Sequence, residues 1–216
     1  MIFVNFKTYQ EGAGERAVQL AGFCQEVARK KKIEIIPVVQ MVDLFRVVKE
    51  VEIPVWVQHL DWQPQGQWTG WLNLEAVVAA GASGTILNHS EHKLPPGTIK
   101  RTIKRVENCK FATLVCCRSL GQAKKLVKFK PDFLAYEPPE LIGGEISVSQ
   151  AEPRAISHFV EICGPISPLV GAGIKNVDDL KVALKLGVKG ILVASGVVLA
   201  KDPKKKLIEL ASGFKK

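Results

Sequence analysis

Eight short apolar runs, separated by amphipathic segments along the whole chain, restrict the possible folds most strongly. The runs are rich in β-branched residues and are mostly continuous, without alternation of apolar and polar positions. A continuous apolar run is typical of a strand buried on both faces, as in a parallel sheet covered by helices. The sequence therefore predicts eight buried strands, at residues 2–6, 33–39, 55–58, 84–88, 110–116, 133–137, 168–172 and 190–194.

The segments between the runs have the spacing of helices. In the first segment, apolar residues recur every three or four positions and form one stripe: Ala17, Leu20, Ala21, Cys24, Val27 and Ala28. Helix starts are predicted at Ser119, where Gln122 completes a capping box, and at Asn176. Gly187 is expected to end the helix that Asn176 begins.

The unbroken alternation of strands and helices predicts parallel strands joined by right-handed crossovers. Two architectures satisfy this pattern, a closed (β/α)8 barrel and an open, doubly wound sheet. Neither a GxGxxG fingerprint nor a P-loop follows the first run, which counts against the open nucleotide-binding sheet. No linker or low-complexity stretch interrupts the pattern. We therefore predict a single α/β domain over residues 1–216, a closed (β/α)8 barrel of the TIM type.

Composition leaves several classes of partner open. The 216 residues carry 30 Lys and Arg against 21 Asp and Glu, a formal net charge of +9. A basic surface attracts anions, so nucleic acid, acidic lipid and phosphorylated metabolites are all admissible partners. The lysine runs at residues 30–32 and 204–206 fall at the end and at the start of predicted helices, which is typical of solvated faces. A nucleic-acid binder would be expected to carry a basic stripe with interleaved aromatics instead, so we expect neither a nucleic-acid nor a membrane partner.

The cysteines and the apolar segments bear on the compartment. Cys116 and Cys117 are adjacent and the other three cysteines stand alone, so neither a disulfide framework nor a CxxC metal site is indicated. The chain reaches Asn5 and Lys7 too early for a signal peptide, and the apolar segment at residues 190–200 is too short for a membrane span. We expect a cytoplasmic protein with reduced thiols.

In a closed barrel of this kind, the active site lies at the carboxyl ends of the strands. Lys7 follows the first predicted strand, His89 follows the fourth and Glu137 ends the sixth. Each residue alone has an ordinary explanation, as a solvated lysine, a structural histidine or an exposed glutamate. Together they supply a cation, an imidazole that can polarise a carbonyl and a carboxylate that can move a carbon-bound proton. Enolisation needs these groups.

Glycine turns follow the last two predicted strands. Residues 171–173 read Gly-Ala-Gly and residues 194–196 read Ala-Ser-Gly. Glycine lets backbone N–H groups approach an anion, and the N-terminus of a following helix favours negative charge. A glycine after a strand is usually only a turn, but beside the three polar groups these turns predict a phosphate site.

Six segments resemble, in order and spacing, the motifs of the triosephosphate isomerase family. Three of them resemble its catalytic motifs and lie at residues 5–9 (NFKTY), 88–91 (NHSE) and 135–138 (AYEP). Residues 138–143 (PPELIG) resemble the start of the lid loop of the archaeal-type branch, and the two glycine turns resemble its phosphate-binding turns. The resemblance covers the whole chain and its compact length. It implies that the protein interconverts dihydroxyacetone phosphate and D-glyceraldehyde 3-phosphate, in glycolysis and gluconeogenesis.

The resemblance implies a role for each polar side chain. Glu137 is the base that moves a proton between C1 and C2 of the substrate, and His89 polarises the carbonyl oxygens as a neutral imidazole. Lys7 supplies positive charge to the substrate oxygens, Asn5 positions them, and Glu91 pairs with Lys7 in the free enzyme. The pairing of a glutamate base with a neutral histidine is an established property of that family.

The resemblance also implies that backbone N–H groups hold the substrate phosphate, at Ile142, Gly143, Gly173, Ala194 and Ser195. No metal ion or redox cofactor is implied. One departure concerns the lid, since the family usually has Gly-Thr-Gly after the isoleucine and this chain has Gly143, Gly144 and Glu145.

Three tryptophans crowd the segment after the third predicted strand, at Trp62, Trp68 and Trp71. Exposed tryptophans usually mark an interface, and packing over the barrel rim is the alternative. The resemblance implies that the loop from Gln63 to Trp71 inserts into a neighbouring subunit. We therefore expect a homo-oligomer, either a dimer or a tetramer.

Two other functions remain as alternatives. Another phosphate-binding βα-barrel enzyme, a lyase or a synthase, would explain the glycine turns and Lys7 but not His89 together with Glu137. A non-enzymatic binder of nucleic acid or of a membrane surface is favoured only by the basic charge. We interpret the positive field as one that steers a dianionic substrate.

Overall fold

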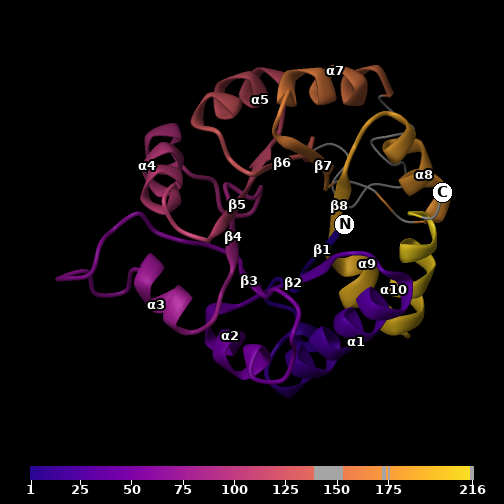
Figure 1. The fold of residues 1–216 in the computed structure, drawn as a ribbon, viewed down its shortest axis with the longest axis horizontal. Coiled ribbons are helices and arrows are strands. Elements are labelled where there is room, and N and C mark those ends of the chain that lie inside the picture. Colours follow the sequence, from indigo (N-terminus) through magenta and orange to yellow (C-terminus); the bar gives the residue numbers. More distant parts are fainter. Residues whose placement is uncertain (139–152, 172–173, 175, 215–216) are drawn as a thin grey trace.

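The computed structural model describes residues 1–138, 153–171, 174 and 176–214, and its strands close into one barrel (Figure 1). Every strand pairs in parallel with the next one along the chain, and the last pairs with the first. The strands are β1 (Ile2–Asn5), β2 (Ile35–Val39), β3 (Trp56–Val57), β4 (Gly84–Leu87), β5 (Ala112–Cys117), β6 (Phe133–Tyr136), β7 (Ser167–Val170) and β8 (Gly190–Val193). The predicted closed (β/α)8 barrel is confirmed, and each predicted strand is present with bounds that differ by at most two residues.

Helices surround the barrel (Figure 1). They are α1 (Glu15–Lys31), α2 (Met41–Val48), α3 (Leu74–Ala79), α4 (Pro96–Val106), α5 (Leu120–Leu126), α7 (Pro153–Cys163), α8 (Val177–Lys185), α9 (Ser195–Val198) and α10 (Pro203–Ser212), with short 3-10 turns η1 (Gln10–Gly12) and η2 (Val127–Phe129). The predicted N-caps are present: the Ser119 side chain accepts from the Gln122 N–H at 3.2 Å, and Asn176 accepts from two N–H groups of α8. The Gln122 side chain accepts from the Arg118 N–H at 2.8 Å and not from that of Ser119, so the capping box differs from the predicted one. Gly187 ends α8 with a left-handed φ of 98°, which favours glycine.

Side chains alternate between two hydrophobic cores. Phe3 points into the barrel and meets Trp56 and Phe133 edge to face, with ring centroids 4.9 and 5.3 Å away. Ile2 and Val4, on either side of Phe3, belong to the second core, between the barrel and its helices. All four residues of β1 are buried, so burial on both faces explains the continuous apolar runs of the sequence.

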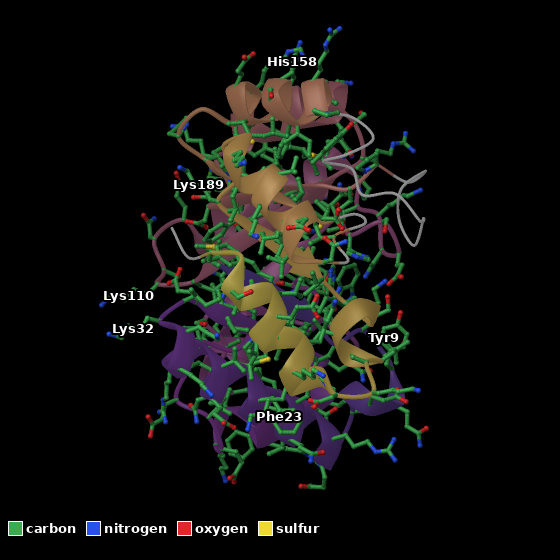
Figure 2. The ribbon with its side chains drawn as sticks, turned by 90° about the vertical axis from the view of Figure 1, so that its right-hand side faces the viewer. Tyr9, Phe23, Lys32, Lys110, His158 and Lys189 are labelled. Atoms are coloured by element: carbon green, nitrogen blue, oxygen red, sulfur yellow. The ribbon has the colours of Figure 1, made fainter. Side chains whose placement is uncertain are left out.

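Because the strands are parallel, the barrel has two chemically different ends. Figure 2 shows Lys32, Lys110 and Lys189, which precede β2, β5 and β8, on one side of the molecule, and Tyr9, which follows β1, on the other. The carboxyl ends of the strands therefore gather on the side of Tyr9. Functional residues are expected at that end.

The positive charge is concentrated on one flank. Residues 96–132, which contain α4, β5 and α5, hold ten Lys and Arg against two Asp and Glu, whereas the rest of the chain holds 20 against 19. By contrast, two lysines of the 204–206 run form ion pairs, Lys204 with Glu26 at 2.6 Å and Lys206 with Glu209 at 3.0 Å. No helix in the described part of the chain combines the length and the apolar character needed to cross a membrane.

Candidate active site

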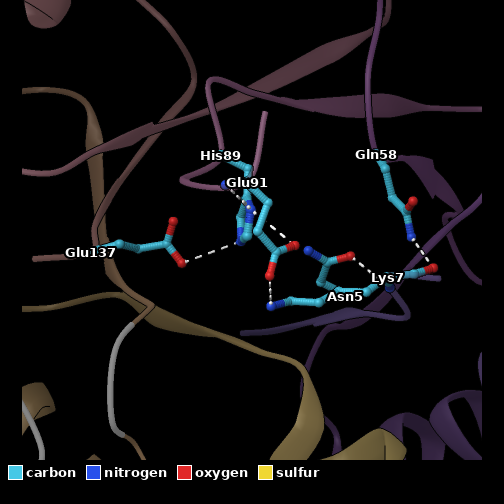
Figure 3. A network of polar contacts seen from close by, with 6 residues as sticks. All are labelled: Asn5, Lys7, Gln58, His89, Glu91 and Glu137. Carbon is cyan, nitrogen blue, oxygen red and sulfur yellow. Dashed lines mark hydrogen bonds and ion pairs between the residues drawn. The ribbon is translucent and has the colours of Figure 1, made fainter. Parts of the chain in front are cut away.

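Side chains from three strand ends meet at the carboxyl end of the barrel (Figure 3). Glu137 directly follows β6, and His89 and Glu91 lie in the loop after β4. Asn5 is the last residue of β1, and Lys7 follows it by two residues. The structure thus brings together all five residues predicted to be catalytic, joined by the contacts that Figure 3 marks.

Glu137 is a buried carboxyl, with 4% of its surface exposed. Its Oε1 lies 3.8 Å from His89 Nε2, and its Oε2 has no hydrogen-bond partner within the described part of the chain. Burial raises the pKa of Glu137 to about 7, against the opposing influence of the Cys116 thiol and the Lys7 ammonium. A carboxyl that ionises near neutral pH and has a free oxygen is suited to act as a general base.

His89 is held as a neutral imidazole. Its Nδ1 accepts a hydrogen bond from the Glu91 backbone N–H at 3.2 Å, which requires a free lone pair on Nδ1. Burial lowers the pKa of His89, the positive charge of Lys7 lowers it further, and Glu91 opposes both. The remaining ring proton therefore lies on Nε2, the nitrogen that faces Glu137, where it can be donated in a hydrogen bond.

Lys7 is fixed at its backbone and at its ammonium group. Its φ of 48° is in the left-handed region, which is uncommon outside glycine and asparagine. The Asn5 Oδ1 accepts from the Lys7 N–H at 3.0 Å, and Gln58 Nε2 donates to the Lys7 carbonyl at 2.9 Å. The Lys7 Nζ lies 2.6 Å from Glu91 Oε1, so the expected ion pair between these residues is present. These contacts hold the ammonium at the mouth of the barrel.

Three residues that contact the site had no predicted catalytic role. Gln58 is the last residue of the third predicted strand, so the strand-end rule that selected Glu137 applies equally to it. Cys116 lies in an apolar run, and nothing in the sequence distinguishes it from its neighbours. Gly171 lies so close that a Cβ atom there would collide with the Glu137 carboxylate, and its neighbours in sequence had suggested only a phosphate turn.

The described residues include two of the five predicted phosphate-binding positions. Ala194 is the N-cap of α9, and Ser195 is the exposed first residue of that helix, at the carboxyl end of β8. The other positions, with the lid residues around them, lie outside the described residues: Ile142, Gly143, Gly144, Glu145 and Gly173. Within the described residues, no group of three or more His, Cys, Asp or Glu side chains is placed to hold a metal ion.

The tryptophan-rich loop projects from the barrel beyond α3 (Figure 1). Asp61 closes the base of the loop, because its N–H donates to the Leu72 carbonyl at 2.9 Å and its Oδ2 accepts from the Leu72 N–H at 2.8 Å. Trp68 and Trp71 are 40% and 50% exposed. Trp62 is only partly exposed and packs under the Arg101 guanidinium, 4.3 Å from its ring centroid. Packing over the rim thus accounts for Trp62 but not for the other two tryptophans.

Comparison with known proteins identifies the family. The sequence model of triosephosphate isomerase matches residues 1–212. A triosephosphate isomerase of Methanobacterium bryantii is 42% identical over 216 residues, which cover 98% of this chain and 96% of that protein. The chain belongs to the triosephosphate isomerase family. Proteins of the same name from Methanothermus fervidus and Methanosarcina acetivorans are 41% and 39% identical, and each alignment covers 97% of this chain and 96% of the relative.

Membership of the triosephosphate isomerase family confirms the resemblance found in the sequence, including its archaeal-type branch. The family is that of an intramolecular isomerase, and nothing in the comparisons favours a lyase or a synthase. The site described above lies where the barrel architecture of this family places it, at the carboxyl ends of the strands.

Proposed function

We propose that the protein interconverts dihydroxyacetone phosphate and D-glyceraldehyde 3-phosphate, with Glu137 as the carbon base. The observation that carries this proposal is the buried Glu137 carboxyl, whose Oε1 lies 3.8 Å from His89 Nε2. One group can accept a proton from carbon while the other donates a hydrogen bond to the oxygen on which charge develops.

In the proposed reaction, ionised Glu137 removes a proton from C1 of dihydroxyacetone phosphate. The C–H electron pair forms a C1–C2 double bond, and the carbonyl electrons move onto O2. His89 Nε2–H and the Lys7 ammonium stabilise this enediolate, and a donor of this kind is typically worth about 3 kcal/mol. A proton moves from O1 to O2 within reach of His89, and Glu137 returns its proton to C2 to give the aldehyde. Asn5 and Glu91 keep Lys7 in place.

The proposed phosphate site is formed by backbone N–H groups of the last two βα turns and of the lid. Ser195 supports this phosphate site because it is exposed at the start of α9. Helix α9 packs against β1, and the end of β1 leads to Lys7. The remaining groups are assigned by the family likeness, at Ile142, Gly143, Gly173 and Ala194. The chemistry needs no metal ion or redox cofactor. Because the proposed reaction belongs to glycolysis and gluconeogenesis, we also propose a cytoplasmic location. Cell fractionation tests this location.

A coupled assay of glyceraldehyde 3-phosphate isomerisation tests the proposal. Glu137→Gln is expected to lower kcat by about 10²–10⁴-fold, because the amide cannot accept the proton, with KM little changed. Glu161→Gln, at an exposed position of α7, is the matched control and should keep wild-type activity. A wild-type protein without isomerase activity, or a Glu137→Gln variant with more than a tenth of wild-type kcat, would contradict the assignment.

Binding of 2-phosphoglycolate, an analogue of the enediolate, tests the oxygen-binding groups. Transition-state analogues bind more tightly than substrates, so the analogue should raise the Tm of the wild-type protein. Lys7→Ala should weaken this protection, because it removes the ammonium that faces the substrate oxygens. An unchanged Tm in saturating analogue would argue against the site.

We also propose that copies of the chain associate through the loop from Gln63 to Trp71. Two large tryptophan rings at its tip are exposed, and a hydrogen-bonded base at Asp61 fixes how the loop projects. Light scattering on a size-exclusion column should give at least a dimer, and Trp68→Ser with Trp71→Ser should lower the mass. Leu199→Ser, at a residue 47% exposed in the turn after α9, is the control. A monomeric wild-type protein would refute the proposal.

A further inference from the structure

Asn88, the residue before His89, combines a left-handed backbone with a fully engaged side chain. It is buried, with 7% of its surface exposed, and its φ is 58°. Its Nδ2 donates to the Cys116 carbonyl at 2.8 Å, and its Oδ1 accepts from the Leu94 N–H at 3.0 Å. Both ends of the amide therefore have backbone partners, one on β5 and one in the loop after β4.

The left-handed backbone of Asn88 is not explained by a helix end. Among the described residues, four that are not glycine have a positive φ: Lys7, Lys32, Asn88 and Lys130. Lys32 ends α1 and Lys130 ends η2, where a left-handed residue is common. The other two, Lys7 and Asn88, are both at the candidate active site. Left-handed backbone conformations away from helix ends cluster at active sites.

The first hydrogen bond connects the histidine side of the site with the glutamate side. Asn88 holds the Cys116 carbonyl, and the next carbonyl along β5, that of Cys117, accepts from the Glu137 N–H at 2.8 Å. Strand β5 is thus tied at its end both to the residue before His89 and to Glu137. These two hydrogen bonds therefore help to set the 3.8 Å distance between His89 Nε2 and Glu137 Oε1.

The second hydrogen bond closes the loop that carries Glu91. By accepting from the Leu94 N–H, Asn88 brings the end of the loop back to its start. Glu91 lies between them and makes two contacts that matter for the site, its N–H with His89 Nδ1 and its carboxylate with Lys7. A loop without this closure would hold neither contact as firmly.

We propose that Asn88 is a positioning residue for the isomerase reaction, which sets the ring of His89 and the carboxylate of Glu91 against Glu137 and Lys7. Both polar ends of its side chain are bound to backbone groups, so it acts through its neighbours. The inference rests on the proposed function for its effect on rate, but its effect on the state of His89 can be measured without any reaction.

Two substitutions separate the backbone from the side chain. Asn88→Gly keeps a residue that accepts a positive φ and removes both hydrogen bonds. Asn88→Asp keeps the acceptor for the Leu94 N–H and removes the donor to Cys116, which gives a second variant if Asn88→Gly does not fold. Thr102→Val is the control, because it removes a buried hydroxyl that donates to the Thr98 carbonyl within α4, away from the site.

The first readout is steady-state kinetics. Asn88→Gly should lower kcat by roughly 10²-fold with KM changed less than about threefold, since small misplacements of catalytic groups cost rate more than binding. Asn88→Asp should lower kcat at least about threefold, and Thr102→Val should keep the wild-type kcat. If Asn88→Gly kept more than about half of the wild-type kcat, or if Asn88→Asp matched the wild type, the proposal would be overturned.

The second readout is ¹⁵N NMR of the histidine rings, which a merely stabilising residue would not change. Wild-type His89 should show a single neutral tautomer with its proton on Nε2, and Asn88→Gly should show a mixture of tautomers as the bond from the Glu91 N–H loosens. A single unchanged tautomer in Asn88→Gly would overturn the proposal. A wild-type protein without isomerase activity would refute the proposed function instead, and the NMR comparison would still test the positioning.

Discussion

The same eight strands form both ends of the barrel, but the polar groups at the two ends differ in their hydrogen-bond partners. At the amino end, the Asp132 carboxylate accepts from the Thr113 N–H at 2.8 Å and from its hydroxyl at 3.0 Å. At the carboxyl end, Glu137 is buried with an oxygen that has no partner among the described residues. Lys7 and Asn88 also hold a left-handed backbone there.

This difference indicates which end stabilises the fold and which end reacts. Satisfied carboxylates and packed aromatic rings stabilise a barrel, whereas a desolvated carboxyl and a strained backbone reduce its stability. Such features persist at functional sites because the chemistry needs them, and stability then comes from elsewhere in the molecule. The predictions below ask whether the two roles can be separated by substitution.

The largest effect on stability is expected at the amino end, from Phe3→Ala. Phe3 is fully buried and contacts two aromatic rings inside the barrel, so its loss leaves a cavity and should cost about 3–5 kcal/mol. Chemical denaturation measures the loss. The variant that remains folded should keep a kcat within about twofold of wild type. A tenfold lower kcat would show that the two ends are coupled.

The next prediction is a gain of stability, from a substitution at the carboxyl end. The pKa of Glu137 is raised from 4.5 to about 7 in the folded protein, so folding favours the protonated form. The folded protein therefore loses stability as pH rises above 4.5, the pKa of this carboxyl in the unfolded state, and the loss is complete above about pH 7. At pH 8 Glu137→Gln should therefore be more stable than wild type, by on the order of 1–3 kcal/mol, while it loses activity.

Denaturation at pH 4 and at pH 8 checks this prediction. The stabilisation by Glu137→Gln should shrink at the lower pH, where the wild-type carboxyl is mostly protonated in both states. A variant that is less stable than wild type at pH 8 would show that the ionised carboxylate has a partner that compensates for its burial.

A smaller loss is expected from Asp132→Ala at the amino end. The substitution leaves the buried N–H and hydroxyl of Thr113 without their acceptor, which should cost about 1–3 kcal/mol. Thermal unfolding measures the change, and kcat should be unaffected. If stability stayed the same, the Asp132 contacts would not contribute to the difference between the two ends.

The fold could be predicted from the sequence because burial on both faces produces continuous apolar runs. The strand bounds could not, since they depend on pairing between strands. The run at 55–58 yields only Trp56–Val57, the two residues that pair with β2 and β4. Strand β5 instead extends to Cys117, because that residue pairs with Tyr136.

The chemistry of the site could be predicted in part, because a side chain after a barrel strand faces the mouth. That rule selects Lys7, His89 and Glu137, and the structure brings these three side chains together. It does not show that Gln58 holds the Lys7 carbonyl or that Asn88 reaches the Cys116 carbonyl. These contacts depend on how separate loops pack against one another. The raised pKa of Glu137 depends on the burial that this packing produces.

The ionisation of Glu137 is the property that most directly distinguishes the reactive end of the barrel from the other end. A ¹³C NMR titration of protein labelled at glutamate carboxyls measures it, with the Glu137 signal assigned by its absence in Glu137→Gln. We predict that this carboxyl titrates near pH 7, above the exposed glutamates, because burial disfavours its charged form. Titration at the ordinary value of 4.5 would contradict the account, since the carboxyl end would then hold an ordinary solvated acid.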